Sequence, residues 1–317
     1  MANLAETPPD VRSLWEGTPP WFPRYAWAVL VYNVAVVIWG AFVRASGSGA
    51  GCGDHWPLCN GQVTPTSPTL HTIIEFTHRT TSGLDLVLVA GMLVWAFRVF
   101  PRRHPARVGA VLSSVFLITE ALIGAALVLL KHVEKNASTS RAYSLSSHLI
   151  NTLTLLACLT LTAWWGMGKP RVLPRGKAAW MAAASLIAVV LAGISGAIAA
   201  LGDTLFPASS LATGFAQDFD PAANICVRLR IFHPMIAAVT GGWLLFYGLW
   251  AVRADPAKRL ALAVMAMAVV QVAAGAVNLL LLAPVWMQLL HLLLADILWI
   301  LLVLLCASMG QAPATAP

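Results

Sequence analysis

The chain has 317 residues, of which 59% are hydrophobic and only 10% are charged. Soluble domains carry about 25% charged residues, so this composition excludes an ordinary soluble fold and favours a membrane protein. The formal net charge of +7 would favour nucleic acid as a partner only if the basic residues formed one patch. They are spread along the chain instead, so we expect no nucleic-acid binding.

Eight apolar runs are long enough to cross a lipid bilayer, which takes about 20 helical residues. In chain order they cover residues 25–45, 72–97, 108–131, 143–167, 178–201, 229–252, 259–282 and 285–309. The sequence therefore predicts an all-α integral membrane protein with eight transmembrane helices.

The basic residues are concentrated in alternate loops. Most of the 20 Lys and Arg residues precede the first run or follow every second run. Because positive charge is typical of cytoplasmic loops, we expect both termini in the cytoplasm and a multi-pass protein of the plasma membrane.

The first four runs resemble the last four. The end of the first run aligns with the end of the fifth, matching Gly40 with Gly196, and a histidine follows each glycine at nearly the same distance. The third and seventh runs align likewise, pairing Glu120 with Gln271 and Gly124 with Gly275. Such self-similarity predicts two pseudo-repeated four-helix bundles.

The predicted organisation has five parts. They are a cytoplasmic N-terminal segment (1–24), a first four-helix half (25–167), a cytoplasmic linker (168–177), a second four-helix half (178–309) and a C-terminal tail (310–317).

Each even-numbered run carries a histidine near its outer end: His78, His148, His233 and His291. Ligating side chains within a bilayer are candidates for function, although a single membrane histidine is often only a contact between helices. Zinc or copper would need all four to converge on one point. Two imidazoles from facing helices can instead bind haem iron axially, so we expect one haem per half, near the outer face.

Three arginines lie beside these histidines at the outer surface, namely Arg79, Arg228 and Arg230. Guanidinium groups pair with carboxylates, so they are candidates for binding haem propionates. The alternative is that they anchor helix ends in the membrane interface.

The two halves differ next to their first histidine. Glu75 precedes His78 by three residues and shares its helix face, whereas Arg230 holds the matching place before His233. A carboxylate beside a haem is a candidate general base or charge stabiliser. We therefore expect substrate chemistry in the first half, although an ion pair between Glu75 and Arg79 would explain the same spacing.

Two cysteines, Cys52 and Cys59, lie in the first outer loop, which reads G-C-G-D-H-W-P-L-C-N-G. Outside the cytoplasm such a pair can form a disulfide, either as a structural link or with a redox role.

Together, this loop, the E-F-T-H-R motif at Glu75–Arg79 and the F-H-P motif at Phe232–Pro234 resemble the haem A synthase family. The resemblance implies oxidation of the C8 methyl of haem O to a formyl group, which makes haem A for cytochrome oxidase. It further implies substrate haem at His78 and His148 with Glu75 as the essential carboxylate, haem b at His233 and His291, and a disulfide between Cys52 and Cys59. Only Cys226 lies in the loop where some members have a second cysteine pair.

The resemblance also implies partners: a haem O synthase as substrate donor, factors of cytochrome oxidase assembly, and an electron acceptor that the sequence does not identify. A dihaem b-type electron-transfer protein is the alternative, yet such a carrier needs two equivalent haems, and the carboxylate and the cysteine pair lie on one side only. A proton-coupled transporter fits less well because the four histidines lie at one depth rather than across the membrane.

Overall fold

The computed structural model describes residues 20–171, 173–253 and 257–309. In these ranges the chain forms ten α-helices and no strand. They are α1 (Trp21–Ala45), α2 (Leu70–Val99), α3 (Pro105–Leu129), α4 (Thr139–Gly166), α5 (Gly176–Leu205), α6 (Leu211–Phe219), α7 (Ile225–Arg230), α8 (Phe232–Ala251), α9 (Lys258–Leu280) and α10 (Val285–Met309).

The eight predicted spans are confirmed as eight helices long and apolar enough to cross a membrane. The sixth span is α7 followed by α8, so it begins at Ile225, four residues before the predicted start. The short α6 lies in the preceding loop and was not predicted. Most of the N-terminal segment 1–24 and the whole tail 310–317 lie outside the described residues.

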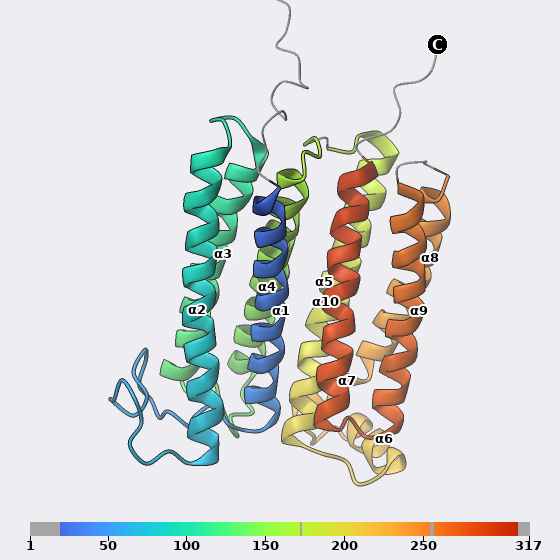
Figure 1. Cartoon of the computed structure of the whole chain (residues 1–317). Helices are drawn as coiled ribbons and strands as arrows, with labels where there is room; N and C mark the ends of the chain where they lie inside the picture. Colours follow the sequence, from blue (N-terminus) through green and yellow to red (C-terminus); the bar gives the residue numbers. More distant parts are fainter. Residues whose placement is uncertain (1–19, 172, 254–256, 310–317) are drawn as a thin grey trace, which may run out of the picture.

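The helices pack as two groups that stand side by side (Figure 1). In the first group, α1 and α3 each contact both α2 and α4. In the second, α5 and α9 each contact both α8 and α10. Consequently α2 stands diagonally opposite α4, and α8 opposite α10, so helices that face each other across a bundle carry the four histidines.

The two groups share an interface made by α1, α4, α5 and α10. Trp299 of α10 lies in the hydrophobic core of the first group and donates its indole N–H to the carbonyl of Leu153, at 2.7 Å. Burial of the aromatic ring and its satisfied N–H stabilise the contact between the groups.

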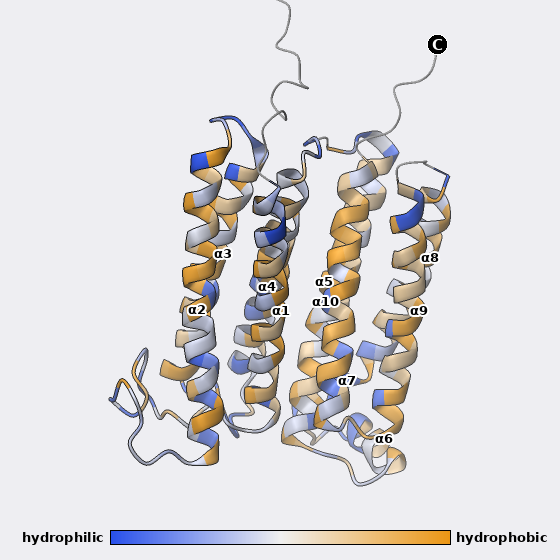
Figure 2. Ribbon diagram, in the orientation of Figure 1, coloured by the Kyte–Doolittle hydropathy of each residue, from blue (hydrophilic) through white to orange (hydrophobic). Residues whose placement is uncertain are grey.

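Side-chain caps fix where three histidine-bearing spans begin. The side chains of Thr69, Ser138 and Asn224 accept hydrogen bonds from backbone N–H groups in the first turns of α2, α4 and α7. Such caps satisfy N–H groups that a helix start leaves without a partner, and each contributes about 1 kcal/mol. The helix interiors are largely apolar, with hydrophilic residues gathered towards the ends and loops (Figure 2).

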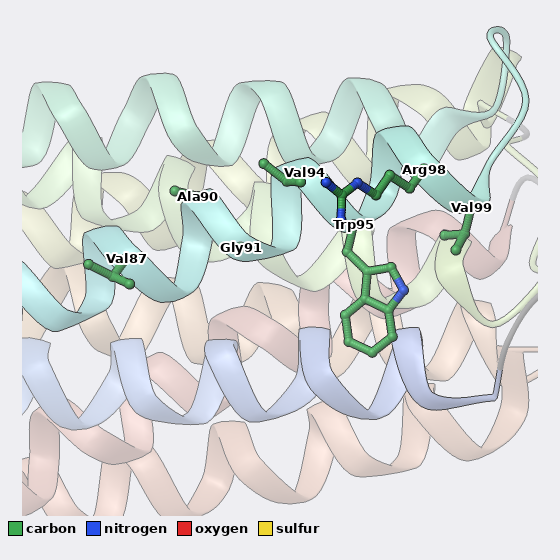
Figure 3. A pocket seen from close by; sticks show the side chains of 7 residues that line it. All are labelled: Val87, Ala90, Gly91, Val94, Trp95, Arg98 and Val99. Carbon is green, nitrogen blue, oxygen red and sulfur yellow. The ribbon is translucent and has the colours of Figure 1, made fainter.

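A hollow of about 720 Å³ lies on α2, lined by Val87, Ala90, Gly91, Val94, Trp95, Arg98 and Val99 (Figure 3). The Trp95 ring points towards α1, where it contacts Tyr25 with ring centroids 5.4 Å apart. The hollow begins nine residues beyond His78 on the same helix, about 13 Å along its axis. It is therefore no part of the histidine sites.

Candidate haem sites

The four histidines lie at one depth of the molecule. Each comes between six and nine residues after the start of its span, which is about 9 to 14 Å along the helix. The starts of these spans lie at the end of the molecule that holds α6 and the loop between α1 and α2 (Figure 1). The side chains are half-buried, so they lie within the bundles rather than in the loops.

Each histidine ring packs against a glycine on the preceding long helix. A Cβ added at Gly40 would lie 2.9 Å from the His78 ring, and one at Gly196 would lie 3.0 Å from the His233 ring. At Gly275 the matching distance to His291 is 3.1 Å, and at Gly124 the distance to His148 is 3.8 Å. Only the absence of a side chain lets three of these rings approach so closely.

In the first bundle, the Nδ1 atom of His148 lies 2.9 Å from Oε1 of Glu120 on α3. The opposing His78 lies within electrostatic reach of both His148 and Glu120. Its Nδ1 is buried and has no hydrogen-bond partner among the described residues. The first pair thus consists of one imidazole with a carboxyl partner and one without.

In the second bundle, the rings of His233 and His291 have centroids 6.4 Å apart. Two imidazoles that ligate one metal ion from opposite sides, at about 2 Å each, have ring centres roughly 6 Å apart. The Nδ1 of His233 lies 3.0 Å from the Ser195 hydroxyl, which leaves Nε2 for a ligand. The Nδ1 of His291 is buried without a partner in the part of the chain described.

These features fit haem. The donor sets are imidazole pairs on facing helices, and the glycines leave the rings room at the helix surface. Within the described ranges, no three His, Cys, Asp or Glu side chains converge on a point suited to a bare metal ion. The 6.4 Å between the His233 and His291 rings and the position of Glu120 beside His148 fit one separate site in each bundle.

Glu75 is buried on α2, three residues before His78, and connects this helix to the outer loop. Its Oε2 accepts the backbone N–H of Cys52, at 2.8 Å. Its Oε1 pairs with Arg79, with 2.5 Å to Nη2 and 3.1 Å to Nε. The ion pair considered as the alternative role of Glu75 is thus present, but the carboxylate also holds the cysteine loop.

Cys52 and Cys59 form a disulfide, as the resemblance implied. The Arg79 guanidinium donates to the carbonyls of His55 and Leu58 in the same loop, at 2.7 Å each. Arg79 therefore connects the loop to Oε1 of Glu75, whereas Cys52 binds the other carboxylate oxygen, Oε2.

The second bundle holds its outer loop through Arg230. Its guanidinium donates to Asp218 at 2.5 Å, to Asp203 at 3.1 Å and to the carbonyl of Gly214 at 2.9 Å. Arg228 is exposed, and Cys226 is buried as a free thiol. Arg79 and Arg230 both bind protein groups here, so propionate binding by the arginines stays a prediction.

Two partners of the histidines escaped sequence reasoning. Glu120 on α3 was aligned with Gln271 but given no role at a histidine, and Ser195 on α5 was not singled out. Both lie on the same helix as a glycine that packs on a histidine: Glu120 four residues before Gly124, and Ser195 next to Gly196. Their closeness in sequence to these glycines was the signal that could have identified them as partners of the histidines.

Comparison with known proteins gives a match to a family model described as "Cytochrome oxidase assembly protein" (COX15-CtaA) over residues 23–303. A Thermus thermophilus protein named "Protoheme IX farnesyltransferase" is 47% identical over 298 residues, which is 92% of this chain and 49% of that protein. The chain thus spans about half the length of this curated relative.

Shorter matches bear another name. A "Heme A synthase" of Halalkalibacterium halodurans is 37% identical over 126 residues, covering 40% of this chain and 42% of that protein. A second, from Geobacillus kaustophilus, is 44% identical over 104 residues, or 33% of each chain.

Proposed function

Because the chain belongs to the family of cytochrome oxidase assembly proteins, we propose that it is a haem A synthase. It would oxidise the C8 methyl group of haem O to a formyl group, making haem A for cytochrome oxidase. The observation that carries this proposal is a half-buried histidine pair in each bundle with the buried carboxylate of Glu75 beside only one of them. The relatives named "Heme A synthase" support it.

The first bundle is assigned the substrate haem, held by His78 and His148. Glu75 lies three residues before His78 and therefore shares its helix face. Its position is fixed from two sides, by the Cys52 N–H and by Arg79. A carboxylate held rigidly is suited to take up a proton leaving the methyl group or to stabilise positive charge that develops there.

The second bundle is assigned a resident haem b, held by His233 and His291. When bound, this haem supplies a one-electron redox centre. The chain contributes the imidazole pair and the Ser195 hydroxyl, which holds the Nδ1 side of His233. With Arg230 in the place of Glu75, this bundle offers no carboxylate at the matching position.

Duplication of one four-helix unit accounts for the frame that the bundles share, namely a histidine pair with a glycine packed on each ring. In each bundle, two glycines on the odd-numbered spans pack on the two histidines of the next spans. The alignment of Gly40 with Gly196 and of Gly124 with Gly275 follows the same pattern, which supports a parallel repeat over 25–167 and 178–309.

The chain is assigned to the plasma membrane with its haem sites near the outer face. The positive-inside rule supports this orientation, because basic residues concentrate at the end where α1 begins and α10 ends. The disulfide lies at the other end, and disulfides persist in oxidising compartments outside the cytoplasm.

A haem O synthase is proposed as the partner that supplies the substrate. The Thermus relative is named for farnesylation of protohaem, and this chain covers only 49% of it, so the remainder has room for a second unit. Haem O is a farnesylated protohaem, and the two activities are therefore consecutive. An electron acceptor is also required, since converting a methyl to a formyl group removes four electrons from carbon.

The test is to express the chain with haem O supplied and to identify the extracted haems by chromatography and mass. The expected product is haem A, together with retained haem b. Unchanged haem O beside bound haem b, with an electron acceptor present, would contradict the enzyme assignment. That outcome would favour a dihaem b-type electron-transfer protein, which the similar histidine and glycine frame of both bundles also suits.

A further inference from the structure

The Glu120 carboxyl group lies in a hydrogen-bond network on the Nδ1 side of His148. Its Oε1 lies 2.9 Å from His148 Nδ1 and also accepts the hydroxyl proton of Thr152. Its Oε2 accepts from the side-chain amide of Asn151, at 2.5 Å. Three polar side chains of α4 thus converge on one carboxyl group of α3.

The orientation of Asn151 is fixed by its other contacts. Its Oδ1 lies 2.6 Å from the Thr119 hydroxyl, and its Nδ2 donates to the carbonyl of Phe116 at 2.8 Å. The amide nitrogen must therefore face Glu120. Oε1 of Glu120 lies beside His148 Nδ1 and beside the Thr152 hydroxyl, which also lies 2.9 Å from the backbone carbonyl of His148. The carboxyl group is therefore placed to accept a hydrogen bond from the Nδ1 side of the imidazole.

The second bundle lacks this arrangement. Gln271 holds the place of Glu120, four residues before the glycine that packs on the histidine. Its Nε2 donates to the backbone carbonyl of His291 at 3.1 Å and lies 3.4 Å from His291 Nε2. An amide therefore stands where the first bundle has a carboxylate, and Nδ1 of His291 has no acceptor among the described residues.

We propose that Glu120 is a positioning residue that keeps the proton of His148 on Nδ1, turns Nε2 towards the iron of the first-bundle haem, and makes that haem harder to reduce than the second. An imidazole that donates to a carboxylate is a more basic ligand and stabilises the oxidised metal. This inference rests on the proposed function in one respect, namely that His148 ligates haem.

The experiment measures the reduction midpoint of the first-bundle haem alone. The full chain is purified with haem O supplied, in a His291→Ala background that removes the second haem, and is titrated potentiometrically. Glu120→Gln is expected to favour reduction at least tenfold, which is about 59 mV for a one-electron couple. The control Glu134→Gln, whose contact with Arg141 uses only its backbone carbonyl, is expected to leave the midpoint unchanged.

A second variant is expected to shift the reduction midpoint in the opposite direction. Thr152→Val removes a competing donor from Glu120 but keeps the charge, so the carboxylate accepts more strongly from His148 and the midpoint should fall. An unchanged midpoint in Glu120→Gln, or shifts of the same sign in both variants, would overturn the inference. The proposed function fails differently, because the chain with both histidine pairs intact would then bind haem O without forming haem A.

Discussion

The two bundles have the same frame but different surroundings. Both set a histidine pair against glycines at one depth. Around that frame the first bundle has two carboxyl groups, Glu75 on the loop side and Glu120 behind His148. The second has Arg230 and Gln271 at the corresponding places. If both histidine pairs bind haem as proposed, the difference in chemistry between the bundles must come from the residues around the pairs.

The outer loops differ in the same way. The first is closed by the disulfide and held to α2 by Arg79. The second is held by ion pairs of Arg230 with Asp203 and Asp218. The disulfide holds Cys52, whose N–H binds Glu75, to Cys59. The ion pairs of Arg230 instead connect α7 to α5 and α6. The loop closed by a disulfide thus belongs to the bundle proposed to carry the reaction.

The largest expected effect comes from removing one ligand of each pair. His148→Ala should abolish haem A formation and leave haem b bound, whereas His291→Ala should remove the haem b. Each variant should lose about half of the bound haem, because loss of one axial ligand opens only one site. Haem type and content per chain are measured by extraction and chromatography. Loss of the same haem in both variants would contradict the division into two different sites.

Substitution of Glu75 should affect the reaction without affecting haem content. Glu75→Gln keeps an oxygen to accept the Cys52 N–H but loses the negative charge, so haem A formation should fall about 10²- to 10⁴-fold, the usual contribution of a general base. Turnover is followed by haem extraction over time. Glu134→Gln, which lies in an outer turn, is the matched control.

Normal turnover in Glu75→Gln would remove the carboxylate from the mechanism and reduce Glu75 to a partner of Arg79. Loss of bound haem in the same variant would instead indicate a role in the binding site. Either result would erase the main chemical difference between the bundles.

Glycine substitutions test the shared frame, with a control inside the first bundle. Gly40→Ala would place a Cβ 2.9 Å from the His78 ring, whereas at Gly124 the nearest atom of His148 is 3.8 Å away. Displacing a packed ring costs about 1–3 kcal/mol, so Gly40→Ala should weaken haem binding roughly 5- to 150-fold. Gly124→Ala should bind haem normally. Equal affinities in a haem titration would show that the close packing on His78 is not needed.

The sequence was sufficient to predict the eight spans and the depth of the histidines. Span length is set by bilayer thickness, and hydropathy records it directly. The depth of His78 and His148 followed from counting residues along helices of known rise. The disulfide was implied by the family motif around Cys52 and Cys59.

The contacts between side chains were less accessible. Arg79 and Arg230 were candidates for binding haem propionates because they lie beside the histidines at the outer surface. The sequence does not reveal that loop carbonyls and Asp218 bind the same guanidinium groups. The helix α6 was missed because nine residues are too short for an apolar run to be recognised as a span. Glu120 looked like any buried polar residue until its distance to His148 was known.

The smallest expected effect comes from opening the first outer loop. Replacing Cys52 and Cys59 together by Ser removes a short covalent loop, which is worth about 2–3 kcal/mol in the chain-entropy account. Arg79 still binds the carbonyls of His55 and Leu58, so the loop should remain near α2 and turnover should fall only a few-fold through looser placement of Glu75. Cys226→Ser is the control, because this free thiol lies in the other bundle. Thermal unfolding and turnover are measured together for both. A loss of turnover as large as that of Glu75→Gln would show that the disulfide itself takes part in the reaction. A loss of stability with normal turnover would limit the disulfide to a structural link. Glu75 and its partner Arg79 would then remain as the chemical difference between the bundles.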